Sequence, residues 1–204
     1  MLIAFEGPDN VGKSTSAARL SYNGQPIYNA TKANHKEAQR DLSTTTVPRG
    51  LEPDLVQTFD RIDWFSHLVY RLALPGAEWA DERPRTVFAM PDTHLVVKIH
   101  RSDLADFTAD EVVDTPIGEV NPMYYYFADY FAALNRARGY ALFKTVSLME
   151  VTNLGEGEYS QRLVAFDSPV TEFGPGSYPG VFGRLVESDE DLLAWLQADE
   201  HARI

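Results

Sequence analysis

The feature that most restricts how this chain can fold is an eight-residue string near its N-terminus. Residues 7–14 read Gly-Pro-Asp-Asn-Val-Gly-Lys-Ser and match the full pattern of two glycines, with four residues between them, followed by Lys and Ser or Thr. The apolar run Leu2–Phe5 precedes the string, and a helix is expected over Ser14–Leu20. A strand, a glycine-containing turn and a helix in this order bring backbone N–H groups and a helix N-terminus onto one anion. The string therefore predicts a nucleotide phosphate site.

Each position of the string has an expected task. The two glycines let the backbone curl around a phosphate group. Lys13 is expected to reach the β- and γ-phosphates of ATP, and the Ser14 hydroxyl to ligate Mg²⁺. The residues predicted to hold the nucleotide are Gly7, Asn10, Val11, Gly12, Lys13, Ser14 and Thr15.

Apolar runs alternate with helical periodicity through residue 151. Strands are predicted at Leu2–Phe5, Gln25–Asn29, Leu55–Phe59, His94–Ile99 and Ala141–Val151, and helices at 14–20, 35–42, 62–74, 81–90 and 124–138. Pro91-Asp92 is interpreted as a turn and the acidic segment 103–119 as a mobile loop. Such alternation implies βαβ units, and so a three-layer α/β fold of the P-loop type with a central parallel sheet of about five strands.

The pattern changes after residue 151. The segments 147–152 and 161–166 flank Asn153–Gly157 and predict a β-hairpin. Ser188, with Asp191 three residues on, predicts a capping box that opens a terminal helix through Trp195. We interpret the chain as a single domain over 1–204, with a core at 1–151 and a C-terminal extension at 152–204.

Composition and charge exclude several classes of protein. The 204 residues include no cysteine, so disulfides, thiolate metal sites and a cysteine nucleophile are excluded, and a cytoplasmic location is expected. No secretory signal or membrane-spanning run is recognised, and the five histidines have no metal-ligand spacing. The net charge of −12 disfavours a nucleic-acid partner. Two runs without Lys or Arg, 103–119 and 187–200, hold 12 of the 30 acidic residues, so the remaining 18 are matched by 18 basic ones.

The longer string Ile3–Thr15 resembles the opening of thymidylate kinases and, more broadly, of nucleoside and nucleotide monophosphate kinases. That family's pattern reads Phe-Glu-Gly-x-Asp-x-x-Gly-Lys-Ser/Thr. Thr58–Arg61 looks like the family's Asp-Arg motif, and Pro91–Val97 looks like the strand that precedes its lid. The resemblance covers about residues 1–151.

The resemblance implies transfer of a phosphoryl group from ATP to a small-molecule acceptor, first a deoxynucleoside monophosphate of the thymidylate kind. By analogy, Asp9 contacts the sugar hydroxyl of the acceptor. Asp60 helps to hold Mg²⁺ through water or orients the acceptor, and Arg61 binds the acceptor's phosphate. An arginine fork suits that last role because it grips phosphate through two hydrogen bonds.

Two groups of aromatic residues invite different interpretations. Trp64 and Phe65 directly follow Asp60-Arg61 and are predicted to stack on the acceptor's base. The cluster Tyr124–Phe127, with Tyr130 and Phe131, is predicted to belong to the core, because helical aromatics at this density usually pack inside.

The sequence departs from the family where a charge-stabilising arginine is expected. Asn10 stands at that position of the Gly7–Ser14 string, and segment 103–119 has no basic residue. The family's Thr-Arg-Glu-Pro segment is replaced by residues 30–34, which leaves Lys32 as a weaker candidate cation. Three explanations stay open. Arg101 serves instead, Arg162 or Arg184 folds over the site from the extension, or the protein binds nucleotide with slow or no transfer.

Three functional hypotheses follow from these alternatives. The first is a kinase with Lys13, Asp60, Arg61 and Arg101 as its catalytic residues and Ser14 and Asp60 as its metal-binding residues. The second is a kinase of a nucleoside or of a modified base in DNA. The third is an accessory protein that binds nucleotide without turnover. The sequence leaves a homodimer open.

Overall fold

The computed structural model describes residues 1–21, 27–29, 56–76, 87–101, 117–138, 142–155, 158–164, 184–185 and 188–202. Its strands are β1 Leu2–Glu6, β2 Tyr28–Asn29, β3 Gln57–Asp60, β4 Met90–His100, β5 Phe143–Gly155, β6 Glu158–Val164 and β7 Arg184–Leu185. Its helices are α1 Lys13–Leu20, α4 Asp63–Ala73, α5 Ile117–Arg138 and α6 Asp189–Ala202.

The described strands form one sheet in the order β2-β3-β1-β4-β5-β6-β7. The first five run parallel to their neighbours, and β6 and β7 are antiparallel. Phe5 lies opposite Asp60 and Glu6 lies opposite Val97, so the carboxyl ends of β1, β3 and β4 meet at one edge. Ligands of open α/β sheets bind at that edge. The predicted fold class, a P-loop-like α/β fold with about five parallel strands, is confirmed.

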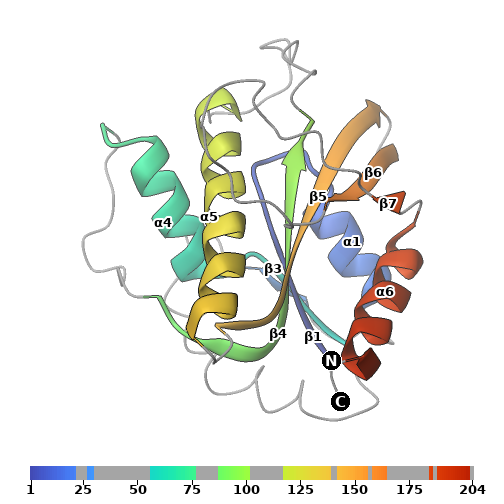
Figure 1. The fold of residues 1–204 in the computed structure, drawn as a ribbon. Helices are drawn as coiled ribbons and strands as arrows, with labels where there is room; N and C mark the ends of the chain where they lie inside the picture. The colour runs from blue at the N-terminus through green and yellow to red at the C-terminus, as the bar shows by residue number, and fades with distance from the viewer. Residues whose placement is uncertain are drawn as a thin grey trace.

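Helices cover both faces of the sheet. In Figure 1, α4 and α5 lie on one side, and α1 and α6 lie on the other. All five residues of β1 are buried, as expected for a central strand covered on both faces. Ala4 belongs to the core beneath α4 and α5, whereas Phe5 belongs to the core beneath α1 and α6. The alternation of side chains along β1 thus divides the interior into two apolar layers.

The extension continues the same sheet. Strands β5 and β6 form the predicted hairpin, and their pairing continues as far as Gly155 and Glu158, so residues 153–155 belong to β5. The predicted cap is also present, because Ser188 Oγ accepts a hydrogen bond from the Asp191 N–H at 3.1 Å. Helix α6 runs past the predicted end at Trp195, as far as Ala202.

Strand β4 begins earlier than the sequence predicted. Met90, predicted as the end of a helix, is the first strand residue, and Pro91-Asp92 lies within the strand and not in a turn. The Met90 N–H donates to the Leu142 carbonyl at 2.6 Å, which secures the start of the strand. Proline is tolerated there because a residue at a strand's beginning can lack a ladder hydrogen bond. The helix predicted over 35–42 lies outside the described residues.

Two helices also differ from their predicted form. Helix α5 begins at Ile117 rather than Tyr124 and contains Pro122, so 117–119 of the predicted loop are helical. Burial of Val120 in the preceding turn helps to offset the backbone hydrogen bond that Pro122 cannot donate. In α4, Leu72 stands at helical spacing from the buried Phe65 and Val69 but is 55% exposed near the helix end.

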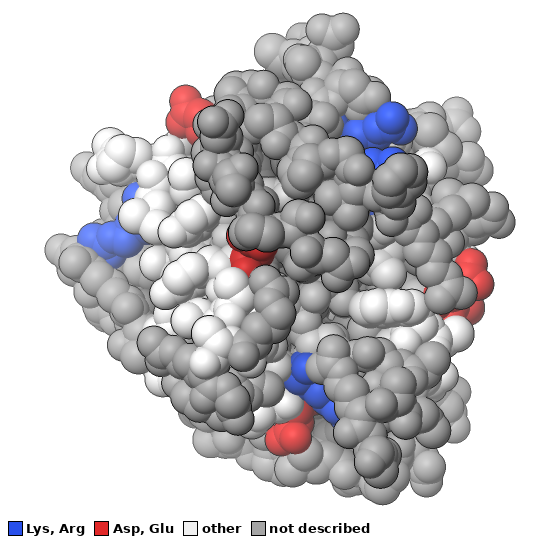
Figure 2. Space-filling model, in the orientation of Figure 1, with Lys and Arg blue, Asp and Glu red and all other residues white. Residues whose placement is uncertain are grey.

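Within the described part of the chain, none of the helices has the length and apolarity that a bilayer crossing requires. On the face shown in Figure 2, the basic side chains that are described lie in separate small groups. The described residues of that face form no continuous basic surface.

Candidate active site

The phosphate loop, which we define as residues 7–14, connects β1 to α1 with the curled backbone that its two glycines predicted. Gly7 and Gly12 have φ values of 146° and 68°, and Asn10 has a φ of 61°. Glycine adopts such angles without strain, and asparagine tolerates them better than most residues. Val11 has its side chain fully buried in the core, so only its backbone is available to a ligand.

Three carbonyl groups of the loop lie within hydrogen-bond distance of side-chain nitrogens. Lys13 Nζ donates to the Pro8 carbonyl, and His100 Nε2 lies 2.8 Å from the Asp9 carbonyl oxygen. Lys98 Nζ donates to the Gly12 carbonyl at 3.3 Å. Successive N–H groups of such a loop can converge on an anion when its backbone is held in place. The loop is thus braced by strand β4 as well as by its own lysine.

Ser14 and Asp60 meet between α1 and the end of β3. Ser14 Oγ donates to Asp60 Oδ2 at 2.5 Å, and Asn29 Nδ2 donates to the same oxygen at 3.3 Å. Asp60 is 3% exposed, and its Oδ1 is buried without a hydrogen-bond partner among the described residues. A hydroxyl and a carboxylate are oxygen ligands of the kind that Mg²⁺ prefers. These two side chains therefore fit the predicted metal site.

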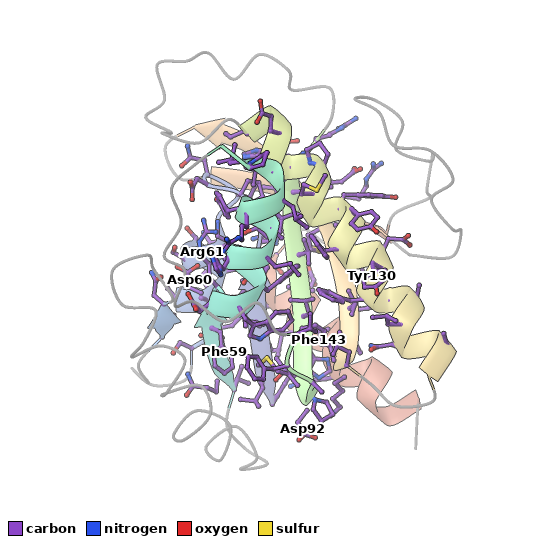
Figure 3. All side chains as sticks on the ribbon, turned by 90° about the vertical axis from the view of Figure 1, so that its left-hand side faces the viewer. Phe59, Asp60, Arg61, Asp92, Tyr130 and Phe143 are labelled. Atoms are coloured by element: carbon purple, nitrogen blue, oxygen red, sulfur yellow. The ribbon has the colours of Figure 1, made fainter. Side chains whose placement is uncertain are left out.

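Arg61 follows Asp60 directly and lies at the same edge of the sheet (Figure 3). Its backbone has a φ of 77°, and its N–H donates to the Phe5 carbonyl at 2.9 Å. Its Nη2 donates to Asp9 Oδ1 at 2.5 Å, and its guanidinium lies 5.7 Å from the centre of the Tyr70 ring. The structure thus brings Asp9 and Arg61 together at the mouth of the phosphate loop.

A hydrogen-bond network beneath Arg61 was missed by the sequence analysis. Arg61 Nη1 donates to Tyr124 Oη at 3.2 Å, and Ser66 Oγ donates to Glu6 Oε2 at 2.9 Å. Glu6 also accepts a hydrogen bond from the Ile62 N–H. In the sequence Glu6 is only one position of the family pattern, whereas in the structure it holds the segment that follows Arg61.

Burial shapes the charge of the site. It raises the pKa of Glu6 to about 7, although Arg61 and the hydrogen bonds from Ile62 and Ser66 act in the opposite direction. Burial, and then the positive charge of Arg61, lowers the pKa of Lys13 to about 7. Both groups therefore titrate near neutral pH when no phosphate is present. An anion bound in the loop would raise the pKa of Lys13 and favour its charged form.

Trp64 and Phe65 do not lie where base stacking requires them. They are 3% and 0% exposed and belong to the apolar layer beneath α4 and α5. Trp64 stacks on Phe143 with ring centres 6.0 Å apart, and Phe65 packs against Phe131 at 5.2 Å. Their predicted role was wrong, because helical periodicity turns these positions of α4 toward the sheet.

The aromatic cluster of α5 divides between core and surface. Tyr124, Tyr125, Phe127 and Phe131 are buried, as predicted. Tyr126 and Tyr130 are 41% and 43% exposed and stack on each other with ring planes 6° apart.

Of the arginines predicted to supply the missing charge, Arg101 lies at the edge of the sheet where β1, β3 and β4 end. It directly follows β4, its side chain is exposed, and its N–H donates to the Val151 carbonyl at 3.2 Å. Arg162 forms an ion pair with Glu150 across the β5–β6 hairpin. The side chain of Arg184, Lys32 and most of segment 103–119 lie outside the described residues.

Asp92 lies far from this edge. It lies near the start of β4 next to Thr93, which pairs with Leu2 at the opposite end of β1. Figure 3 shows Asp92 and Asp60 toward different ends of the sheet. The family motif that Pro91-Asp92 was taken to match therefore adds no side chain to the site.

Comparisons with known proteins add little to this geometry. No family model matches the sequence, and no curated protein matches it. Among solved structures, the crystal structure of YorR protein from Bacillus subtilis in complex with phosphorylated GDP is similar, with a TM-score of 0.45 and 16% identity over 98% of each chain.

Proposed function

We propose that this protein is an ATP-dependent kinase that transfers a phosphoryl group to a small nucleotide, with a deoxynucleoside monophosphate of the thymidylate kind as the first acceptor to test. The observation that carries the proposal is the contact between Ser14 Oγ and Asp60 Oδ2 at 2.5 Å. It joins the phosphate loop to the end of β3, the arrangement that phosphoryl transfer with a metal-bound nucleotide requires.

The donor side of the reaction belongs to the phosphate loop. Its N–H groups and the N-terminus of α1 bind the phosphates of ATP, and Lys13 exchanges its contact with the Pro8 carbonyl for the β- and γ-phosphates. Ser14 and Asp60 hold Mg²⁺, directly or through water, and the ion offsets negative charge on the phosphates.

The acceptor side belongs to Arg61 and Asp9. The guanidinium of Arg61 binds the acceptor's phosphate, and the carboxylate of Asp9 accepts a hydrogen bond from a sugar hydroxyl. The side chain of Arg61 is 15% exposed and that of Asp9 is 41% exposed, so both are accessible to a small ligand. Acceptor binding exchanges the Arg61–Asp9 ion pair for contacts with the acceptor.

The reaction itself is then a matter of position and charge. An oxygen of the acceptor's phosphate attacks the γ-phosphorus of ATP, the bond to the bridging oxygen breaks, and ADP leaves with its electron pair. Arg101 is proposed as the cation that stabilises the transferring group. Lys13, Asp60, Arg61 and Arg101 are thus the proposed catalytic residues.

The second candidate function is nucleotide binding without turnover. The absence of Lys and Arg from segment 103–119 favours it, because a phosphoryl-transfer site without a transition-state cation loses about 10³-fold in rate. A kinase of a nucleoside or of a modified base in DNA remains a further outcome of the same test.

Two measurements decide among these functions. Calorimetry with ATP and Mg²⁺ should detect binding to the wild type and to Lys144→Ala, a cation at the start of β5, but not to Lys13→Ala. Equal affinity for all three, or none, would overturn the nucleotide site. An ADP-release assay over nucleosides, nucleoside monophosphates and DNA oligonucleotides then identifies the acceptor. Binding of ATP with no ADP release on any acceptor establishes the accessory function instead.

A further inference from the structure

Lys98 is a charged residue in the interior of β4. It is 1% exposed, although its neighbours along the strand, Val97 and Ile99, are core residues. A buried ammonium group is costly unless other groups compensate for the water that it has lost. Lys98 therefore needs hydrogen-bond partners inside the protein.

The contacts of Lys98 reach both glycines of the phosphate loop. Its Nζ donates to the Gly12 carbonyl at 3.3 Å and to Ser16 Oγ at 2.5 Å. Its own carbonyl oxygen lies against Gly7, where an added Cβ would come within 2.0 Å. One residue of β4 thus touches the beginning and the end of the loop.

A second set of contacts connects this lysine to the extension. Ser16 Oγ donates to Asp189 Oδ1 at 2.8 Å, and Gln161 Nε2 donates to the same oxygen at 3.2 Å. Asp189 is the first residue of α6 and is 2% exposed. The chain of hydrogen bonds runs from the Gly12 carbonyl through Lys98 and Ser16 to two elements that follow residue 151.

The charges around Lys98 favour its protonated form at neutral pH. Burial lowers its pKa to about 8, the carboxylate of Asp189 acts against that shift, and Arg19 acts with it. Arg19 also forms an ion pair with Asp189 at 3.5 Å, but its side chain is 57% exposed. The Lys98 ammonium further lies 5.8 Å from the centre of the Phe5 ring, an arrangement that attracts a cation.

We propose that Lys98 is a positioning residue of the phosphate loop, and that Asp189 supports it through Ser16 so that the C-terminal extension forms part of the nucleotide site. The inference rests on the proposed function, since it takes the loop to be a nucleotide site. Lys98 adds a second hydrogen bond to the Gly12 carbonyl, which also accepts from the Ser16 N–H at 3.0 Å, and so fixes the start of α1, whose N–H groups bind the phosphates. It also places a positive charge behind the loop.

The test combines nucleotide affinity with stability. Lys98→Met keeps the length of the side chain and removes its charge and donors, and Asp189→Asn removes the supporting charge. Thr145→Val is the matched control, because it deletes a buried hydroxyl on β5 whose partner is His94 Nδ1 at 2.8 Å and which has no contact with the loop. Calorimetry with ATP and thermal unfolding are measured for each folded variant.

We expect ATP to bind about tenfold more weakly to Lys98→Met, the size of a lost hydrogen bond to a charged group, and severalfold more weakly to Asp189→Asn. The control should lose stability and keep the affinity of the wild type. In turnover, the KM for ATP should rise more than the KM for the acceptor in both variants, because Arg61, which binds the acceptor's phosphate, is held by Tyr124 and the Phe5 carbonyl and not by Lys98. A merely structural role would lower the melting temperature without this separation of KM values.

The outcomes separate the inference from the proposed function. Wild-type affinity for ATP in folded Lys98→Met and Asp189→Asn overturns the inference and leaves the proposed function standing. If Lys98→Met does not fold, Asp189→Asn decides alone. A wild type that does not bind ATP overturns both proposals together.

Discussion

Gly7 and Lys98 approach each other so closely that no side chain fits between them. A Cβ added to Gly7 would lie 2.0 Å from the carbonyl oxygen of Lys98, and the φ of Gly7 is 146°. The first glycine of the loop is therefore required twice, by its backbone angle and by the neighbouring strand.

This contact predicts a large effect of Gly7→Ala. The methyl group must displace backbone and not a flexible side chain, so we expect unfolding free energy to fall by about 3 kcal/mol or more. Urea denaturation measures the change. Gly118→Ala is the control, because nothing lies within 4 Å of its added Cβ and it lies in α5. It should be neutral or stabilising by up to about 1 kcal/mol. Equal effects of the two substitutions would contradict the prediction.

A second prediction concerns the metal. Asp60→Asn keeps the size of the side chain but removes the charge beside Ser14, so the gain in ATP affinity on adding Mg²⁺ should fall by about 10- to 100-fold. Affinity in the presence of a chelator should stay within a few-fold of wild type. Calorimetry with and without Mg²⁺ measures both. Asp63→Asn, a buried carboxylate in the first turn of α4, should retain the full response to Mg²⁺. A full response in Asp60→Asn would remove Asp60 from the metal site.

The sequence predicted the phosphate loop and the parallel sheet because both depend on local patterns. A glycine-rich string between an apolar strand and a helix has few alternatives, and strand alternation with helices restricts the topology. Element boundaries were less certain. Pro91-Asp92 was interpreted as a turn and the helix was predicted to begin at Tyr124, yet β4 includes Pro91 and α5 includes Pro122.

The site's supporting residues depend on contacts between distant parts of the chain. Glu6 and Ser66 are 60 residues apart, and Ser16 and Asp189 are 173 apart. No local pattern reports such pairs. A signal for Lys98 was nevertheless present, since a lysine inside an otherwise apolar strand must have partners. The opposite error arose at Trp64, where closeness in sequence to Arg61 was taken for closeness to the ligand.

The third prediction concerns the pH dependence of stability. Burial raises the pKa of Glu6 from 4.5 to about 7, so between these values the folded protein holds a proton that the unfolded chain releases. Stability contributed by this group is present below about pH 4.5 and is lost as the pH rises through 7. Its slope approaches about 1 kcal/mol per pH unit.

Glu6→Gln isolates this group. Gln cannot titrate and can still accept the hydrogen bond from the Ile62 N–H, so the variant should gain stability relative to wild type as the pH rises from 4.5 to 7. Urea denaturation at several pH values measures the difference between the two proteins. A difference that is constant over this range would show that Glu6 titrates normally.

The last prediction identifies the cation for phosphoryl transfer. Arg101 directly follows β4 at the edge that carries Lys13 and Arg61, and its side chain is exposed at that edge. Arg101→Ala should keep ATP affinity within a few-fold of wild type, because the loop binds the ground state. Its kcat should fall by about 10³-fold, because the arginine acts on charge that develops during transfer. Arg162→Ala is the comparison, since that guanidinium is paired with Glu150 on the hairpin and should leave kcat unchanged. An unchanged kcat in Arg101→Ala together with a loss in Arg162→Ala would assign the role to the extension instead.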